Sequence, residues 1–254
     1  MIQILASILS ILAGLSAAPA EAADLKVISA GAVRGLIAQI IDDYSRETGQ
    51  KFDFTIGTTG QLRNIIATGQ HADLIIVSAP LMGELEKTGK LTPGSRADLG
   101  RVGIGVTIRA GAPIPDVSTP EAFKRALVDA RSVAYTDPAE GGTTGIYFAG
   151  LAERLGIADS ISKKAVLTKG GREAAIEVAE GRAEMAIVFI SESMAVKGVK
   201  LAGPLPPPLQ DYSVYAAAIP ASSTDVRAAR AFIGALTSAE MAERWRANGF
   251  EPPK

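Results

Sequence analysis

The sequence predicts an α/β protein of two lobes joined by two hinge strands. Short apolar segments rich in β-branched residues alternate with helical patterns, as expected for mostly parallel sheets flanked by helices. Two longer strands, at 101–109 and 211–219, separate these repeats into an inner and an outer group. A chain that crosses into a second lobe and then returns has this order. We expect residues 23–104 and 216–254 to form the first lobe and residues 105–215 the second.

The first helix has the clearest pattern in the chain. An apolar stripe at helical spacing runs over residues 33–47, and Gly49 provides the end of the helix. The stripe consists of Val33, Leu36, Ile37, Ile40, Ile41 and Tyr44. This helix is therefore expected to pack one face onto a sheet.

The same strand-turn-helix unit recurs along the chain. "KFDFTI" leads through "GTTG" to a helix that begins at Gln61 and ends at Gly69, and "ADLIIVS" is then a buried strand because its apolar run is unbroken. Thr119 caps a helix with Pro120 at its first position. These segments add two strands and two helices to the predicted order of elements.

The inner group continues the pattern, and two helices follow it. The strand "SVAYT" leads through "DPAEGGTTG" to a helix over 144–155, and "AVLTKGG" enters a helix over 172–180. "EMAIVFI" is another buried strand. After the second long strand we expect two C-terminal helices, starting near Ser223 and Ser238.

Composition excludes several classes of function. With 26 basic and 27 acidic residues, the chain has no charge bias toward nucleic acid or anionic membranes. It has no Cys, which excludes disulfides and thiol chemistry. The single His, His71, leaves no multi-histidine metal site, and its polar turn indicates a surface position. We expect no metal, no cofactor and no nucleic-acid partner.

The N-terminal segment is typical of an export signal. Residues 1–22 contain an apolar run followed by small residues that end Ala20-Glu21-Ala22. The apolar run is too short, and too soon followed by Pro19, for a membrane-spanning helix. No Lys or Arg precedes it, which departs from the usual signal. We expect cleavage near Ala22.

Four turns of small residues each join a strand end to a helix start. The carboxyl ends of strands in open α/β sheets converge on a ligand crevice, and free N–H groups at helix starts favour an anion there. Such residues are also ordinary helix caps and turn formers, so one turn alone indicates little. The four turns are "SAGAV" at 29–33, "GTTGQ" at 57–61, "GGTTG" at 141–145 and "TKGGR" at 168–172. Their threonines, Thr58, Thr59, Thr143 and Thr144, add hydroxyl donors.

Three arginines follow these turns closely. Arg34, Arg63 and Arg172 lie near helix starts, where a positive charge is unfavourable by roughly 0.3–1 kcal/mol when exposed. They either pair with surface acids or face a bound anion. Because a guanidinium can form paired N–H bonds with a carboxylate, we expect Arg34 to help hold an anion.

At these turns the sequence resembles the molybdate-binding proteins of bacterial ABC importers, within the type II periplasmic binding protein superfamily. The resemblance covers about 24–254. It rests on "VISAGAVRGLI", "GTTGQLRNIIATGQHADLIIVSA", "YTDPAEGGTTGIYFAGLAERLG", "AIVFISESMAVKGVK" and "AERWRANGF". It implies a monomeric periplasmic solute-binding protein that closes its lobes on a small anion and docks on an inner-membrane ABC permease.

The resemblance also implies a set of ligand-binding residues, and this chain departs from the family among them. Ala32 stands at the family's first serine position and Phe189 at its tyrosine position, so two neutral donors are lost. Arg34 and Arg63 stand where molybdate binders have uncharged residues. The implied set is Gly31, Ala32, Val33, Arg34, Thr58, Thr59, Ser78, Thr143, Thr144, Gly171, Arg172 and Phe189, with Arg63 as a possible addition.

The ligand class follows from these departures. Neutral donors hold a tetrahedral oxyanion well, whereas arginine suits planar carboxylates. We therefore expect a small di- or tricarboxylate, with molybdate or tungstate as the alternative. An anion sensor and a periplasmic enzyme are further alternatives. We expect no enzyme, because the predicted cleft has hydroxyls but no histidine to activate them.

Overall fold

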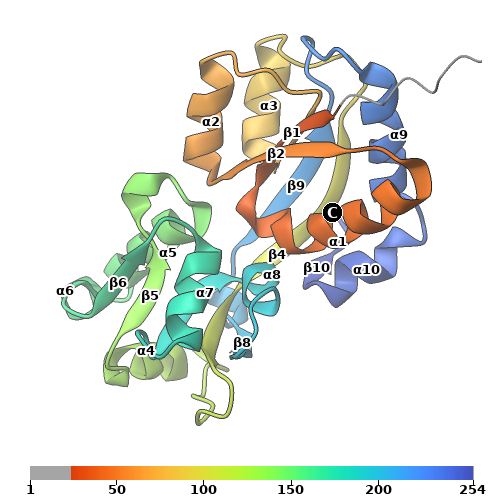
Figure 1. The fold of residues 1–254 in the computed structure, drawn as a ribbon. Helices are drawn as coiled ribbons and strands as arrows, with labels where there is room; N and C mark the ends of the chain where they lie inside the picture. Colours follow the sequence, from red (N-terminus) through yellow and green to blue (C-terminus); the bar gives the residue numbers. More distant parts are fainter. Residues whose placement is uncertain (1–23, 254) are drawn as a thin grey trace, which may run out of the picture.

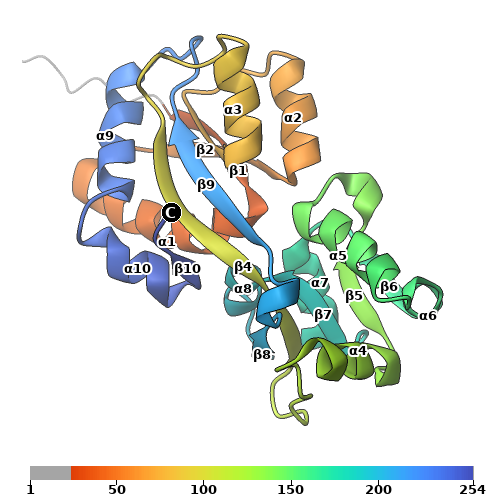
Figure 2. The same ribbon diagram turned by 180° about the vertical axis from the view of Figure 1, so that it is seen from behind.

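The computed structural model describes residues 24–253, so the predicted signal peptide lies outside the described residues. Figure 1 and Figure 2 show two lobes with one strand, β4 (Ala97–Arg109), passing from one to the other. The predicted two-lobe α/β fold is confirmed. Within residues 24–253, no helix is both long enough and apolar enough to cross a membrane.

The first lobe is built on a sheet with the strand order β2-β1-β3-β9-β4. β1 is parallel to β2 and β3, whereas β9 runs antiparallel to β3 and β4. Helices α2 and α3 lie on one flank of this sheet, and α1, α9 and α10 lie on the other (Figures 1 and 2). The strands are β1 (Leu25–Ala30), β2 (Phe52–Gly57), β3 (Leu74–Ser78), β9 (Tyr212–Ala218) and β10 (Phe250–Glu251), and the helices are α1 (Arg34–Thr48), α2 (Thr59–Ala67), α3 (Ala79–Lys87), α9 (Val226–Leu236) and α10 (Met241–Ala247).

The second lobe continues the sheet from the far half of β4 in the order β4-β7-β5-β6. β5 is parallel to β6 and β7, and β8 pairs with β4. The strands are β5 (Val133–Thr136), β6 (Ala165–Thr168), β7 (Met185–Phe189) and β8 (Val199–Pro204), and the helices are α4 (Pro120–Asp129), α5 (Thr143–Arg154), α6 (Ala158–Ser162), α7 (Gly171–Ala179) and α8 (Ile190–Met194). Three short 3-10 helices complete the chain: η1 (Gly31–Val33), η2 (Pro138–Glu140) and η3 (Pro207–Leu209).

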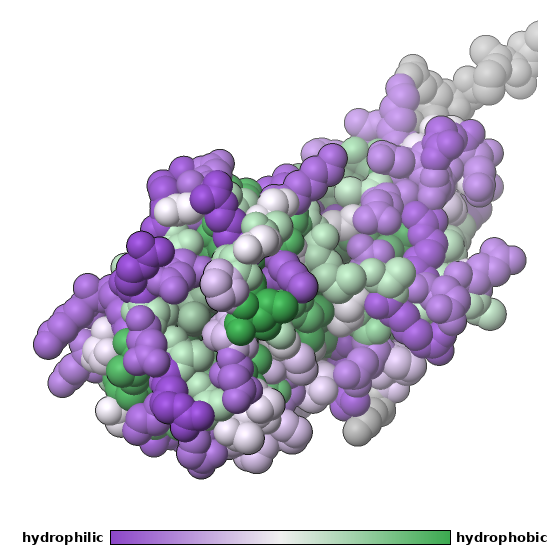
Figure 3. All heavy atoms as spheres, turned by 90° about the horizontal axis from the view of Figure 1, so that it is seen from below, coloured by the Kyte–Doolittle hydropathy of each residue, from purple (hydrophilic) through white to green (hydrophobic). Residues whose placement is uncertain are grey.

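The predicted patterns account for most of these elements. The stripe of α1 buries Leu36, Ile37 and Ile40, and the helix ends at Gly49, whose φ is 76°. β3 is buried at every position, as its unbroken apolar run predicts. Helices α3, α6 and α8 were not predicted. On the face in Figure 3, polar residues surround the apolar patches.

The two lobes meet where β4 changes partners. Residues 97–103 of β4 pair with β9, and residues 104–108 pair with β7. At the change, the Gln210 side chain accepts a hydrogen bond from Ile104 N at 2.8 Å and donates one to Ile104 O at 2.9 Å. β9 pairs with first-lobe strands from Tyr212 onward, whereas residues up to 215 were expected to belong to the second lobe.

Candidate functional site

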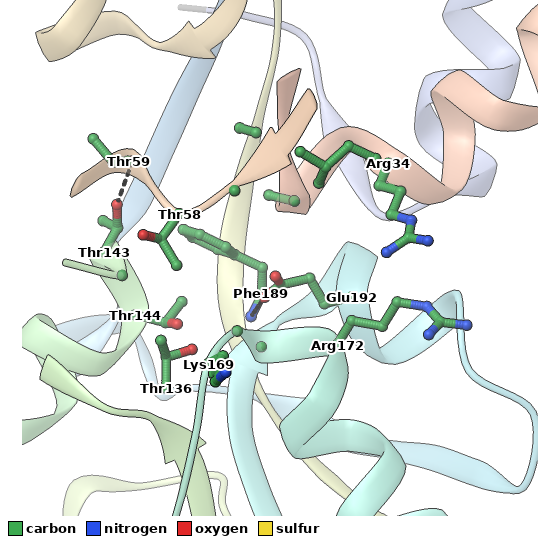
Figure 4. A pocket seen from close by; sticks show the side chains of 18 of the residues that line it. Arg34, Thr58, Thr59, Thr136, Thr143, Thr144, Lys169, Arg172, Phe189 and Glu192 are labelled. Atoms are coloured by element: carbon green, nitrogen blue, oxygen red, sulfur yellow. Dashed lines mark hydrogen bonds between the residues drawn. The ribbon is translucent and has the colours of Figure 1, made fainter. Parts of the chain in front are cut away.

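The four predicted turns come together around one cavity of about 260 Å³ between the lobes. The first lobe contributes the starts of η1 and α2, and the second contributes the starts of α5 and α7 (Figure 4). These helix starts lie close together because each follows the carboxyl end of a β-strand, and those ends face the gap between the lobes. We call this space the interlobe cavity.

Ten of the residues named from the sequence line this cavity. They are Gly31, Ala32, Arg34, Thr58, Thr59, Thr143, Thr144, Gly171, Arg172 and Phe189. Ala32 and Phe189 are small or apolar where the resemblance implied hydroxyl donors, so the donors of this cavity must come from other positions.

Three residues named from the sequence do not line the cavity. Val33 is fully buried in the core, and Ser78 is buried at the start of α3. Arg63 forms two hydrogen bonds of 3.0 Å with the carboxylate of Glu84, on α3. The Arg63 guanidinium is thus paired on the surface and does not face an anion in the cavity.

Several lining residues were missed from the sequence, and Tyr215 corrects a specific expectation. Tyr215, on β9, lines the cavity with its ring edge-on to Phe189, at 6.1 Å and 84°. The cavity therefore has a tyrosine although Phe189 holds the position where one was expected. The others are Ala30, Ile56, Gly57, Gln61, Thr136, Gly142, Lys169, Gly170, Glu173 and Glu192. Alternation along "DYSVYAAAI" offered the signal for Tyr215, because Ser213, Tyr215 and Ala217 share one face of the strand.

Three cations belong to the cavity wall, and none forms an ion pair with another residue of the described chain. They are Arg34, at the start of α1, and Lys169 and Arg172, around the start of α7. Arg34 and Lys169 are exposed and Arg172 is half-buried. In Figure 4, Arg34 and Arg172 reach from opposite lobes to the same side of Glu192, away from the threonines. Unpaired cations at helix starts make the mouth of the cavity electropositive.

The lobes are in contact along the threonine side of the cavity. Gly60 N donates to Gly141 O at 3.0 Å, and Gln61 Nε2 donates to Glu140 Oε2 at 2.7 Å. Thr58 Oγ1 also donates to the carbonyl oxygen of Glu140. The Thr58 hydroxyl, which the sequence assigned to a ligand, is therefore occupied by Glu140.

The threonine hydroxyls divide into two groups. Those of Thr59 and Thr143 lie 3.3 Å apart across the lobes and bond each other. Thr136 and Thr144 are buried in the second lobe and line the cavity, and neither hydroxyl is engaged by another residue within 24–253. These two hydroxyls are the threonine donors left for a ligand.

Glu192 is the acidic residue buried in the cavity wall, with 8% of its surface exposed. Its carboxyl accepts hydrogen bonds from the backbone N–H groups of Phe189, at 3.3 Å, and of Gly171. Burial raises the pKa of Glu192 to about 7, and the nearby Glu173 adds to the rise, although the two N–H bonds oppose it. A Cβ at Gly171 would lie 2.0 Å from Glu192 Oε2, so a larger residue at this position would have to displace the carboxyl group.

The described residues contain no group of three or more His, Asp or Glu side chains that could hold a metal ion. The residues that line the cavity offer cations, hydroxyls, backbone N–H groups and one buried carboxyl.

Comparison with known proteins gives one family and one curated relative. Residues 25–251 match the model of the family described as bacterial extracellular solute-binding protein. An aconitate isomerase from Pseudomonas sp. is 32% identical over 234 residues, which cover 90% of this chain and 87% of that protein.

Solved structures with similar folds include two oxyanion-binding proteins. The periplasmic molybdate-binding protein of Azotobacter vinelandii has a TM-score of 0.75 at 20% identity, covering 91% of this chain and 100% of that one. The sulfate-binding protein of Mycobacterium tuberculosis has a TM-score of 0.70 at 18% identity, covering 90% and 86%. At these identities the similarity shows the fold, and the fold is that of type II periplasmic binding proteins.

Proposed function

Because this chain belongs to the bacterial extracellular solute-binding protein family, we propose that it captures a small di- or tricarboxylate in the interlobe cavity. In this proposal the protein is exported to the periplasm, with its signal peptide cleaved near Ala22, and works as a monomer. It delivers the acid to an inner-membrane ABC permease. Binding closes the lobes, since the ligand contacts both of them and favours the closed state.

The observation that carries the proposal is the set of unpaired cations around the cavity. Arg34 from the first lobe and Lys169 and Arg172 from the second have no acidic partner within residues 24–253. A multivalent carboxylate supplies the missing charge to both lobes at once, and guanidinium groups match its planar oxygen pairs. The volume of about 260 Å³ is below the roughly 300–1,000 Å³ of drug-sized sites, which suits a small acid.

The threonine side of the cavity offers the ligand a second set of hydrogen-bond partners. On the side away from Arg34 and Arg172 lie the free hydroxyls of Thr136 and Thr144 (Figure 4) and the start of α5, whose first N–H groups have no partner within the helix. One carboxylate can sit on these donors while another remains near the cations at the mouth. We propose the ten lining residues named above as ligand contacts, together with Thr136, Lys169, Glu192 and Tyr215.

The curated relative supports the same ligand class. Aconitate is an unsaturated tricarboxylate, and the protein named for acting on it aligns with most of this chain. The alternative ligand, molybdate or tungstate, is favoured by the fold of the molybdate-binding neighbour. The neutral donor shell that suits molybdate is less well matched in this cavity, because Ala32 carries no hydroxyl and Thr58 donates to Glu140, although Tyr215 provides a tyrosine where Phe189 does not.

A second candidate function is isomerisation of the bound acid. The relative's name and the buried carboxyl of Glu192 favour it. A proton removed from the carbon beside a double bond leaves a carbanion that the conjugated carboxylate delocalises. Returning the proton at another carbon moves the double bond without oxidation or reduction. A carboxyl that exchanges a proton near neutral pH suits this transfer.

The test is a ligand panel read by thermal shift and calorimetry on the mature protein. The panel contains molybdate, tungstate, sulfate, citrate, cis-aconitate, trans-aconitate and dicarboxylates. A ligand at 100 times its Kd adds about 2.7 kcal/mol of stability, so binders stand out clearly. We expect polycarboxylates to stabilise the protein. Stabilisation by molybdate and tungstate alone contradicts the proposal.

Two arginine variants make the test specific to the site. Arg34→Ala removes a cation of the cavity and should weaken polycarboxylate binding roughly 10- to 150-fold, the value of a charged hydrogen bond. Arg63→Ala is the matched control, because Arg63 pairs with Glu84 outside the cavity. This variant should bind polycarboxylates as the unaltered protein does. NMR of the protein with cis- or trans-aconitate then separates the two functions: interconversion supports the isomerase, and binding without conversion supports capture.

A further inference from the structure

Glu192 lies where the two lobes meet, on the short helix α8. The neighbouring Ser191 donates a hydrogen bond of 2.8 Å to Ala32 O in η1, so α8 is fixed against the first lobe as well as the second. Figure 4 shows Glu192 between Phe189 and Arg172, at the inner wall of the interlobe cavity. The carboxyl is therefore held in place where a ligand would reach it.

The groups that face Glu192 do not compensate a negative charge. Its bonded partners are the N–H groups of Phe189 and Gly171, and the ionisable groups beside it are Glu173 on α7 and Tyr215 on β9. No cation forms an ion pair with Glu192 within the described chain, although three line the same cavity. Burying an ionised carboxyl without a cation is costly, so this environment favours the neutral acid.

A neutral carboxyl has both an acceptor and a donor. The backbone N–H groups of Phe189 and Gly171 take up acceptor capacity, and the O–H is left for the cavity. A second anion placed beside an ionised Glu192 would repel it, whereas the O–H can donate to a ligand oxygen. In this geometry the ionised carboxylate of Glu192 opposes anion binding and the neutral carboxyl favours it.

We propose that Glu192 is protonated in the liganded protein and donates a hydrogen bond to the bound anion, so that anion and proton are taken up together. This inference rests on the proposed function, since it requires an anion in the interlobe cavity. It makes Glu192 a residue that determines specificity: the ligand must present an unprotonated oxygen at that point.

The sign of the pH dependence follows. Burial already raises the pKa of Glu192 to about 7, and a bound negative charge raises it further. Above pH 7 the free protein must gain a proton as it binds, so affinity falls as pH rises, by at most tenfold per unit. Glu173 and Tyr215 do not reverse this sign, because a negative charge on either also favours a protonated Glu192.

The primary experiment is calorimetry with trans-aconitate at pH 8, in buffers of different ionisation enthalpy, with molybdate as a second probe. Close to one proton should be taken up per ligand bound. A proton count of zero, together with an affinity that does not change between pH 6.5 and 8.5, overturns the inference. This measurement uses the unaltered protein and does not depend on a variant folding.

Glu192→Gln gives the complementary test, because glutamine keeps the shape and the donor but cannot ionise. The variant should bind with an affinity independent of pH and, at pH 8.5, should bind about 30-fold more tightly than the unaltered protein, the factor set by 1.5 units above a pKa of about 7. Loss of binding at every pH would show that the ionised carboxylate is needed, and would overturn the inference.

A control and a further outcome separate this inference from the proposed function. Glu153→Gln, at an exposed position of α5 away from the cavity lining, should keep the proton uptake and the pH dependence of the unaltered protein. A protein that binds no member of the panel at any pH ends the proposed function, and the inference with it. Binding without proton uptake ends the inference alone.

Discussion

The backbone nitrogen of Gly60 donates a 3.0 Å hydrogen bond to the carbonyl oxygen of Gly141, and so joins the two lobes beside the interlobe cavity. The approach is close enough that a Cβ on Gly60 would lie 2.8 Å from the Cα of Gly141. This contact between the lobes therefore depends on the absence of a side chain at Gly60.

Gly60→Ala should hold the lobes apart and weaken ligand binding by tenfold or more. The change favours helix α2 itself, because alanine is a better helix former by roughly 1 kcal/mol, so the fold should persist. Calorimetry measures the affinity, and small-angle X-ray scattering with saturating ligand should give a larger radius of gyration than for the unaltered protein. Gly83→Ala, in α3 with nothing within 4 Å of the added atom, is the control and should leave both unchanged. Equal affinities for the two variants would show that the contact is not needed for closure.

Gly171→Ala should displace Glu192 from its place in the cavity wall. The added Cβ would lie 2.0 Å from Glu192 Oε2 and 2.6 Å from its Cδ, far inside van der Waals contact. We expect ligand affinity to fall at least tenfold and its pH dependence to disappear, as measured by calorimetry between pH 6.5 and 8.5. Gly234→Ala, in α9 with open space around it, should retain both. A Gly171→Ala protein with the original pH profile would mean that Glu192 has room to move.

The free energy of unfolding of the ligand-free protein should depend on pH through the ionisation of Glu192. Because the folded pKa is raised from 4.5 to about 7, the folded state holds a proton that the unfolded state has released. The contribution to the free energy of unfolding is complete below pH 4.5, declines as pH rises through 7, and is lost above. At about 1.4 kcal/mol per unit, the whole loss is roughly 3 kcal/mol. Urea unfolding of the unaltered protein and of Glu192→Gln at pH 5.5 and 8.5 tests this. Between these two pH values, the free energy of unfolding of the unaltered protein should fall relative to that of the variant.

Asp73 should show the opposite dependence. Burial alone would raise its pKa, but hydrogen bonds from the backbone N–H groups of Lys26, Thr224 and Asp225 outweigh burial and lower it. The stabilisation is therefore present above the unfolded pKa, near 4, and is lost as pH falls through the folded pKa. Asp73→Asn should lower the free energy of unfolding at pH 7 by roughly 1–3 kcal/mol, the cost of unsatisfied buried groups. Asp53→Asn, exposed on β2, is the control. A deficit for Asp73→Asn that is as large at pH 3 as at pH 7 would contradict this account.

Much of the fold was predictable because its signals are local. The stripe of α1, the unbroken apolar run of β3 and the small-residue turns each follow from periodicity and turn chemistry, and the rule for strand ends then brings the turns together. Ten named residues accordingly line one cavity.

The site residues that were missed or misassigned depend on tertiary contacts. Arg63 is a possible ligand residue by its sequence position, but its partner Glu84 lies on α3, a helix that the sequence pattern does not predict. Glu192 follows an apolar strand on a five-residue helix, and it is buried by the packing of α8 against β4, β8, α7 and η1. Nothing in the local pattern distinguishes such a glutamate from a surface cap.

The clamp of Gln210 on both main-chain groups of Ile104 has a mechanical consequence. At the crossing between the lobes, Ile104 N bonds to a side-chain amide in place of a neighbouring strand, and Ile104 O accepts from that amide and from Leu205 N at 3.1 Å. Because the Gln210 side chain has three rotatable bonds, its amide can follow a rotation of Ile104, whereas a paired strand would resist that rotation. We therefore expect that one lobe can rotate on the other at this crossing while Ile104 N and Ile104 O keep their hydrogen bonds to Gln210.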